Sequence, residues 1–381
     1  MKKRYLILSI SLWLLVAVLG IGAIIYGVGG GFSKMTTGVL VKEESIALGS
    51  IRSIEVSSTY QSVEIRKTTD DHIKISQYGH DDLSGDELFS VSTSDGSVRI
   101  YMTGKWHFRI MNFIDDTLII EIPENFSGDL DAETSSGSMK VIDEFQWTTA
   151  ALKSSSGDIH IYDHLTADSL YAKTSSGAIR AEGNIRSNGD VSFKSSSGDI
   201  RLGGTVTAKN LNAETSTGAI RFQASVDMTE NITLKSSSGS IRLDGEIQAA
   251  KLQATVNSGG IGLGSVAVES FYLESSSGTI NADSISGGGE AKTTSGGIRL
   301  TLKDPGDSVN LNATSGDIRV WLESSLQFTL EAQTTSGGIH TNFATEKNEK
   351  GNKATAIIGD HPTVQIIAHA SSGGIRIEQS E

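Results

Sequence analysis

Apolar and polar residues alternate along most of this chain in short runs that repeat about every twenty residues. Before a recurring Ser-Ser-Gly phrase, small or apolar side chains occupy every second position, as at Leu211, Ala213 and Thr215, and they alternate again after it, as at Ile220 and Phe222. A period of two is typical of β-strands with one buried face. The buried set moves from odd to even positions across the phrase, so the chain must bend there. We therefore expect each repeat to be a strand, a corner, a second strand and a connector.

The Ser-Ser-Gly phrase, with small variations, recurs twelve times. Its glycines are Gly137, Gly157, Gly177, Gly198, Gly218, Gly239, Gly259, Gly278, Gly296, Gly316, Gly337 and Gly373. Neighbouring glycines are 18 to 21 residues apart, except for the last pair, which are 36 apart. We expect that long gap to hold a polar loop, 342–363, whose segment 346–353 projects from the stack. At each corner, glycine would permit a positive φ and the serines would bond nearby backbone groups.

Near-identical repeats of constant length favour an all-β solenoid (β-helix) of ~20-residue rungs over a β-sandwich, which also has regular turn signals. One two-strand unit cannot bury its apolar side alone. Stacking each repeat on its predecessor in register solves this and gives each backbone N–H and C=O a partner one rung away, with equivalent residues about 4.8 Å apart. Inward hydroxyl residues would then form a ladder, which we interpret as structural and not as a set of catalytic serines. The ladder would contain Thr134, Ser154, Thr174, Ser195 and Thr215.

The chain begins with a long apolar segment. Residues 5–28 carry no charge and are long enough to span a bilayer, and Lys2, Lys3 and Arg4 come immediately before them. The positive-inside rule places those cations in the cytoplasm. A cleaved signal peptide is the alternative, but its apolar region is shorter and a small-residue cleavage site follows it. We therefore expect one N-terminal transmembrane helix before the solenoid, in a single-pass protein of the cell membrane whose bulk is extracytoplasmic.

The expected organisation is a cytoplasmic tip (1–4), the transmembrane helix (5–28), a linker (29–44), N-terminal strands or a cap of the solenoid (45–130), and the Ser-Ser-Gly solenoid (131–381). In the cap region, Leu118, Ile120 and Ile122 share one face of a strand that a proline closes. A cap would cover the otherwise open end of the stack.

Composition narrows the possible chemistry. The chain has no Cys, which excludes disulfides, thiol catalysis and Cys-ligated metals. Its net charge of −13 disfavours nucleic acid as a partner, because phosphate binding needs a basic surface. The 8 His show no recognised metal-binding spacing, and His160 and His164 fall in a predicted strand and turn. We expect no catalytic residue, metal or cofactor. Solenoid polysaccharide lyases leave a carbohydrate-cleaving enzyme as an alternative by analogy of fold.

The position just past the motif isoleucine is basic in ten repeats. It holds Lys140, His160, Arg180, Arg201, Arg221, Arg242, Arg299, Arg319, His340 and Arg376. Alternation points this position outward, so stacking would align these residues into a basic stripe. One interpretation is a solvated face that Asp158, Asp199 and Asp317 neutralise. The other is a docking site for an extended anionic polymer, such as wall teichoic acid or the carboxylates of peptidoglycan.

The leading anchor, the L-x-I-x-I-P run from Leu118 to Pro123 and the repeated S-S-G-x-I phrase resemble the DUF4097 family of bacterial envelope proteins. The resemblance covers about residues 45–381. It implies a cell-surface β-strand-repeat protein described as an adhesin, in a family sometimes linked to envelope-stress systems and without established catalytic residues.

Three functions follow from these observations. The first is a membrane-anchored, extracytoplasmic binding module, adhesin-like or structural. The second is an envelope-stress accessory protein that binds cell-wall or membrane components or another envelope protein. The third, a polysaccharide-active enzyme, would need converging carboxylates that the sequence does not show.

Overall fold

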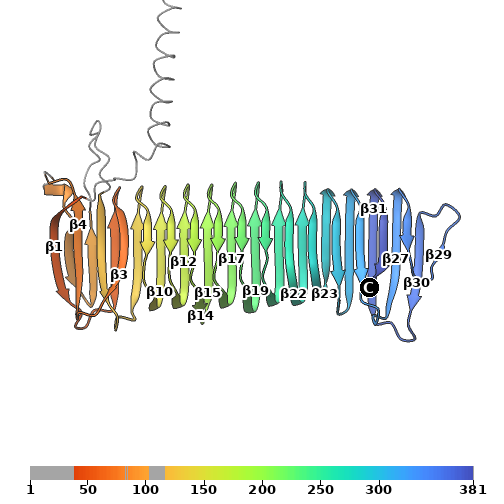
Figure 1. Cartoon of the computed structure of the whole chain (residues 1–381), viewed down its shortest axis with the longest axis horizontal. Helices are drawn as coiled ribbons and strands as arrows, with labels where there is room; N and C mark the ends of the chain where they lie inside the picture. The colour runs from red at the N-terminus through yellow and green to blue at the C-terminus, as the bar shows by residue number, and fades with distance from the viewer. Residues whose placement is uncertain (1–37, 82, 84, 103–115, 381) are drawn as a thin grey trace, which may run out of the picture.

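The computed structural model describes residues 38–81, 83, 85–102 and 116–380, and these form one elongated rod of stacked β-rungs (Figure 1). Within this part of the chain there are 32 strands and no α-helix, so the predicted all-β solenoid is confirmed. The expected transmembrane helix, 5–28, lies outside the described residues. Among those that are described, no helix has the length and apolar character needed to cross a bilayer.

Each central rung combines a long strand and a short strand on either side of the Ser-Ser-Gly corner. β10 (Phe145–Ser154) pairs in parallel with β8 (Asp129–Thr134) and β12 (Leu165–Thr174). β11 (Ile159–Ile161) pairs in the same way with β9 (Met139–Val141) and β13 (Ile179–Ala181). Equivalent residues therefore lie in files along the rod, as the repeat predicts.

The same arrangement continues along the rod. Its strands are β14 (Ile185–Ser187), β15 (Asp190–Ser195), β16 (Ile200–Leu202), β17 (Val206–Thr215), β18 (Ile220–Phe222), β19 (Val226–Ser236), β20 (Ile241–Leu243), β21 (Ile247–Val256), β22 (Ile261–Ser275), β23 (Ile280–Ser295), β24 (Ile298–Leu302), β25 (Ser308–Ser315) and β26 (Ile318–Leu322).

A second bend divides the long strand in the central rungs, whereas the strands from β24 to β27 (Phe328–Ser336) alternate without a break. In β10 the buried positions are Phe145 and Trp147, then Ala150, Leu152 and Ser154, so the parity changes near residue 148. At the equivalent place the chain breaks between β14 and β15. A central rung therefore has three faces, whereas the sequence predicted two strands and one corner. No fixed residue type marks this second bend, which explains why the repeat pattern did not reveal it.

The N-terminal rungs do not follow sequence order. β2 (Ser53–Ser58) and β3 (Ser62–Thr68) form a rung between two others. One neighbour is made by β6 (Ser97–Tyr101) and β7 (Thr117–Pro123), and the other by β8 and β9. After β2 and β3, the chain forms the outer rung of β6 and β7, and it then crosses to the other side of the β2–β3 rung to form β8 and β9.

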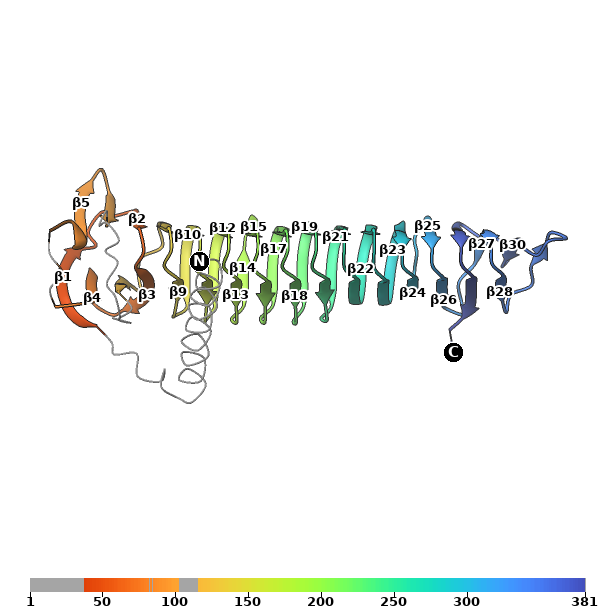
Figure 2. The same cartoon turned by 90° about the horizontal axis from the view of Figure 1, so that it is seen from above.

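Antiparallel strands cover the N-terminal end (Figure 2). They are β1 (Val39–Ala47), β4 (His72–Gly79) and β5 (Ser90–Ser94), near the 3₁₀ turn Gly85–Glu87. β1 pairs with β4 and starts at Val39, so part of the segment 29–44, expected as a linker, belongs to the sheet. Antiparallel caps of this kind occupy a sheet edge that could otherwise pair with another chain.

The C-terminal end also departs from sequence order. β31 (Val364–Ser372) and β32 (Ile375–Gln379) lie between β25–β26 and the rung of β27 (Phe328–Ser336) and β28 (Ile339–Thr341). β30 (Lys353–Ile358) pairs antiparallel with the outer edge of β27, and β29 (Glu346–Lys347) pairs with β30. The expectation that each segment lies on its predecessor is therefore wrong at both ends. The 36-residue gap gives the chain enough length to reach outward and return.

The motif isoleucine forms the most regular file of the core. Ile159, Ile179, Ile200 and Ile220 are each 0% exposed, and the file continues along the rod. Burying one such side chain is worth about 1.5–3 kcal/mol. The core therefore grows rung by rung, which suits a solenoid stabilised by contacts between neighbouring repeats.

The motif glycines are required by close approach of the backbone. A Cβ on Gly198 would lie 1.9 Å from the carbonyl oxygen of Gly177, and one on Gly177 would lie 2.1 Å from that of Gly157. The positive φ expected at these corners is wrong. Among the motif glycines only Gly337 has a positive φ, and at 159° it is nearly extended. Glycine is present because no side chain fits between the rungs.

Candidate functional site

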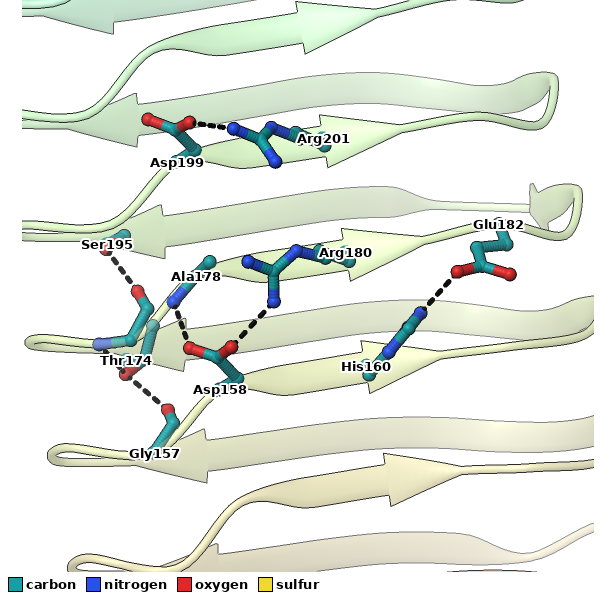
Figure 3. A network of polar contacts seen from close by, with 11 residues as sticks. Gly157, Asp158, His160, Thr174, Ala178, Arg180, Glu182, Ser195, Asp199 and Arg201 are labelled. Carbon is teal, nitrogen blue, oxygen red and sulfur yellow. Dashed lines mark hydrogen bonds and ion pairs between the residues drawn. The ribbon is translucent and has the colours of Figure 1, made fainter. Parts of the chain in front are cut away.

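The hydroxyl ladder runs inside the Ser-Ser-Gly corner (Figure 3). Thr174 Oγ1 accepts the N–H of Gly177 at 3.1 Å and donates to the carbonyl oxygen of Gly157 at 2.9 Å. Ser195 repeats the pattern one rung later, with distances of 2.8 and 3.0 Å. Each hydroxyl thus joins its own corner to the preceding one. Its roles as donor and acceptor are both used and it is buried, so the structural interpretation of these serines and threonines is confirmed.

The basic stripe is aligned as the sequence predicts. Strand register places its members side by side in the order Lys140, His160, Arg180, Arg201, Arg221, Arg242, Gly262, Asn281, Arg299, Arg319, Arg376 and His340. Gly262 and Asn281 interrupt it. We call Lys140 to Arg242 the N-terminal cluster, and Arg299, Arg319, Arg376 and His340 the C-terminal cluster.

Carboxylates beside the stripe neutralise part of its charge. Arg180 Nη1 lies 2.6 Å from Asp158 Oδ2, and Asp199 Oδ2 contacts both Arg201 at 2.6 Å and Arg221 at 3.0 Å. The predicted neutralisation by these aspartates is confirmed. The arginine side chains of these pairs keep between 36% and 50% of their exposure, so the pairs contribute little to stability and stay accessible to a competing anion.

Asp158 and Asp199 also join successive rungs. Asp158 Oδ1 accepts the backbone N–H of Ala178 at 2.8 Å, and Asp199 Oδ1 accepts that of Ala219 at 2.8 Å. Partial burial acts to raise the pKa of each carboxyl, but the backbone hydrogen bond and the arginine partners outweigh it. The pKa values of both are therefore lower than usual.

Sequence reasoning missed this cross-rung role of aspartate, although the chain carries a signal for it. At the position after the motif glycine, each Asp is followed in the next rung by a residue with little or no side chain. Asp158 faces Ala178, Asp199 faces Ala219, and Asp317 faces Gly374, whose N–H lies 2.9 Å from Asp317 Oδ1. The alternation leaves room for the carboxylate and avoids stacked like charges.

His160 is a partly buried member of the stripe, with 19% of its side chain exposed, and its partner is a carboxylate on the next rung. The His160 ring stacks on that of Tyr162 with centroids 3.6 Å apart. Its Nε2 lies 2.8 Å from Glu182 Oε1 (Figure 3). No group of three or more His, Asp or Glu residues suited to a metal ion occurs in the part of the chain that the structure describes. His160 therefore participates in a surface network with an aromatic ring and a carboxylate.

A second outward file, on the other side of the corner, carries charges of both signs. Lys153 pairs with Asp131 at 2.8 Å, and Lys194 pairs with Glu214 at 3.2 Å. Further along, Lys292 lies 4.8 Å from the centre of the Tyr272 ring, and a hydrogen bond with Tyr272 raises the pKa of Lys292. We call this second file the mixed file. Its members, in strand register, are Glu133, Lys153, Lys173, Lys194, Glu214, Lys235, Thr255, Glu274, Lys292, Asn312, His369 and Gln333. Carboxylates and neutral residues interrupt its lysines, so they do not form a continuous basic row along the rod.

The sequence matches one known protein family. Residues 51–244 and 206–378 match the Toastrack DUF4097 family. Among proteins with curated functions, none matches. Similar solved structures include a proposed cell adhesion protein from Clostridium sporogenes, 11% identical over 89% of this chain and 99% of that chain, with a TM-score of 0.18. A proposed adhesin from Parabacteroides distasonis is 12% identical over 89% of this chain and 97% of that chain, with a TM-score of 0.31.

A further solved structure is a proposed lipid-binding protein, also from Parabacteroides distasonis. It is 13% identical over 71% of this chain and 96% of that chain, with a TM-score of 0.22. Because the TM-scores and identities of these structures are this low, no conclusion about the present chain rests on them. The family matches are broader, since together they run from residue 51 to residue 378 and include every rung that carries the basic stripe. The chain therefore belongs to the Toastrack DUF4097 family.

Proposed function

We propose that this protein is a membrane-anchored, extracytoplasmic binding module that docks an anionic polymer of the cell envelope along its basic stripe. The observation that supports the proposal is the strand register of Arg180, Arg201, Arg221 and Arg242 on four consecutive rungs. Equivalent positions on paired strands are about 4.8 Å apart. A linear polymer lying along the rod would meet one guanidinium per rung.

Guanidinium groups suit phosphate and carboxylate ligands because they donate two parallel hydrogen bonds. The aspartates now paired with them are only partly buried, with 44% of Asp158 and 26% of Asp199 exposed. A polymer can therefore compete for the arginines at modest cost. A linear polymer makes several weak contacts with the stripe. Once one contact forms, the others become intramolecular, so the affinity of the whole polymer exceeds that of any single ion pair.

The anchor rests on the sequence of residues 5–28. Because β1 begins at Val39, about ten residues would separate the predicted span from the first strand. Fully extended, a segment of that length reaches roughly 35 Å. The base of the rod would then stay close to the membrane.

The test uses the full chain in detergent micelles and its co-sedimentation with purified teichoic acid and peptidoglycan at increasing salt. The stripe variant replaces Arg180, Arg201, Arg221 and Arg242 with Ser. The control replaces an equal number of lysines in the mixed file with Ser, so that both variants lose the same net charge. The control positions are Lys153, Lys173, Lys194 and Lys235.

We expect the stripe variant to lose binding and its salt dependence, and the control to keep both. Equal loss in the two variants would mean that net charge alone decides binding. Unchanged binding by the stripe variant would remove the proposal. Retention of an envelope protein in place of polymer would favour the envelope-stress role.

A further inference from the structure

The C-terminal cluster of the stripe is less neutralised than the N-terminal one. Register aligns Arg299, Arg319 and Arg376 on β24, β26 and β32. Arg319 lies 3.4 Å from Asp317 and Arg376 lies 3.4 Å from Glu378, against 2.6 Å for the tightest pairs of the N-terminal cluster. Arg299 has no ion pair among the described residues. These three guanidiniums are therefore more available to an external anion.

A hollow of about 400 Å³ opens beside these arginines. Arg319, Arg376 and His340 line it together with Asp317, Gly338 and Gly374. An anion bound here would therefore compete with the Asp317 carboxylate for Arg319. A Cβ on Gly338 would meet no atom within 4 Å, and the nearest atom to one on Gly374 would be 3.6 Å away. Unlike the motif glycines, neither is crowded by the next rung: Gly338 faces open space, and the space at Gly374 is shared with the Asp317 carboxylate. The hollow thus exists because both repeats have a second glycine after the first.

An aromatic side chain lies next to the cationic row. Trp321 follows Arg319 by two positions on β26, so both side chains point outward on the same face. Register places Thr301 on one side of Trp321 and Glu378 on the other. Trp321 is half-buried, whereas Trp147 is buried in the core. A tryptophan at the surface beside a row of arginines offers an apolar face and a charged end within one site.

We propose that the C-terminal cluster is a subsite for an anionic saccharide, with the guanidiniums of Arg319 and Arg376 binding its phosphate or carboxylate and Trp321 packing on the sugar ring. This inference rests on the proposed function and names the chemistry of its ligand. Thr301 and Glu378 flank the ring position and supply a hydroxyl and a carboxylate for sugar hydroxyl groups. Glu378 would repel a charge placed there, so the site orients the ligand with its anion at the arginines.

The experiment compares ligands on the full chain in detergent micelles by titration calorimetry. The probes are a phosphorylated oligosaccharide, a carboxylated one (oligogalacturonate), a neutral glucan oligosaccharide and inorganic polyphosphate. The first two distinguish phosphate from carboxylate as the preferred anion. Polyphosphate carries charge without a sugar, so it reports on the arginines alone.

The main variants are Trp321→Thr, which places there the residue that the neighbouring rung has at this position, and Arg319→Ser combined with Arg376→Ser. We expect the tryptophan variant to lose tenfold or more in affinity for the anionic oligosaccharides while its polyphosphate affinity changes less than twofold. The arginine variant should weaken both ligands. Trp321→Phe keeps a ring and should retain most of the oligosaccharide affinity.

Gly338→Leu tests the subsite while leaving Trp321 in place. The leucine side chain would fill the hollow, and the substitution is tolerated because an added Cβ at Gly338 meets no atom within 4 Å. It should also weaken the anionic oligosaccharides. Oligosaccharide affinity unchanged by both Trp321→Thr and Gly338→Leu would overturn the subsite, even if polyphosphate still binds the N-terminal cluster. Absence of binding by every anionic probe would overturn the proposed function as well.

Discussion

Replacing Gly198 with Ala tests the close approach of the rungs most directly. The new Cβ would lie 1.9 Å from the Gly177 carbonyl oxygen, whereas ordinary contacts are 3.4–4 Å. The two rungs must therefore separate locally by more than about 1 Å, which is large for a close-packed interior. At the same corner, Ser195 Oγ donates to Gly177 O at 3.0 Å and Ser197 N donates to Ser175 O at 2.9 Å. Separation of that size breaks both hydrogen bonds.

Two hydrogen bonds at about 1 kcal/mol each, together with about 1–3 kcal/mol for overpacking, give a loss of about 3–5 kcal/mol. Gly262→Ala is the matched control, since its Cβ would meet only Arg242 Cγ at 3.9 Å. That substitution in an open strand position should change stability by less than about 1 kcal/mol, in the stabilising direction.

The assay is urea unfolding of the two variants and the parent chain, followed by far-UV circular dichroism. Because solenoids can unfold in sections, hydrogen exchange of the amides in residues 170–202 locates the effect. We expect a lower urea midpoint and faster exchange in this segment for Gly198→Ala alone. Equal midpoints for Gly198→Ala and Gly262→Ala would refute the idea that rung spacing forbids a side chain at the corner.

Two other predictions concern the polar groups that join the rungs. Thr174→Val should destabilise the chain by about 1–3 kcal/mol, because it removes a hydroxyl that makes two buried hydrogen bonds. Val256→Thr should stabilise the chain, because it adds the hydroxyl that is missing from the ladder in the rung of Val256. The urea midpoints of the two variants check both predictions. The lowered pKa values of Asp158 and Asp199 mean that the unfolded chain binds more protons, so their stabilisation is complete above the ordinary value of 3.8 and is lost as pH falls through the folded pKa values. The urea midpoint should therefore drop on acidification below that value, and less steeply after Asp158→Asn and Asp199→Asn; identical slopes would contradict the assignment.

Much of the functional surface was predictable from periodicity. Once repeats of about twenty residues stack in register, residues at the same motif position must form files. Arg180, Arg201 and Arg221 could thus be placed side by side before any coordinates existed, and the structure confirms it. The hydroxyl ladder followed from the same reasoning. The alternation predicted that these hydroxyl side chains point inward, but it did not predict the two hydrogen-bond partners of each hydroxyl.

Other parts of the site depended on residues from different repeats meeting in space. The alternation of Asp158, Ala178, Asp199 and Ala219 was present in the sequence, but its meaning required the carboxylate to reach the next rung's N–H. Trp321 gave no signal by itself. Its position beside the arginines matters only because β32 is inserted next to β26, which brings Arg376 and Glu378 to the same surface.

The strands, the Ser-Ser-Gly corners and the outward direction of the stripe follow from the amino-acid pattern, because alternation and repeat length are local properties that hold in every copy. The order of the rungs at both ends, the second bend of the central rungs and the close spacing that requires glycine depend on contacts between rungs, so they became apparent only in the folded protein. β25 could pair locally with either the β27 rung or the β31 rung, since both carry the same alternating pattern. In the structure β30 covers one edge of β27 and β31 pairs with the other, so β25 pairs with β31. This outcome depends on contacts between segments, which the pattern of a single repeat does not contain.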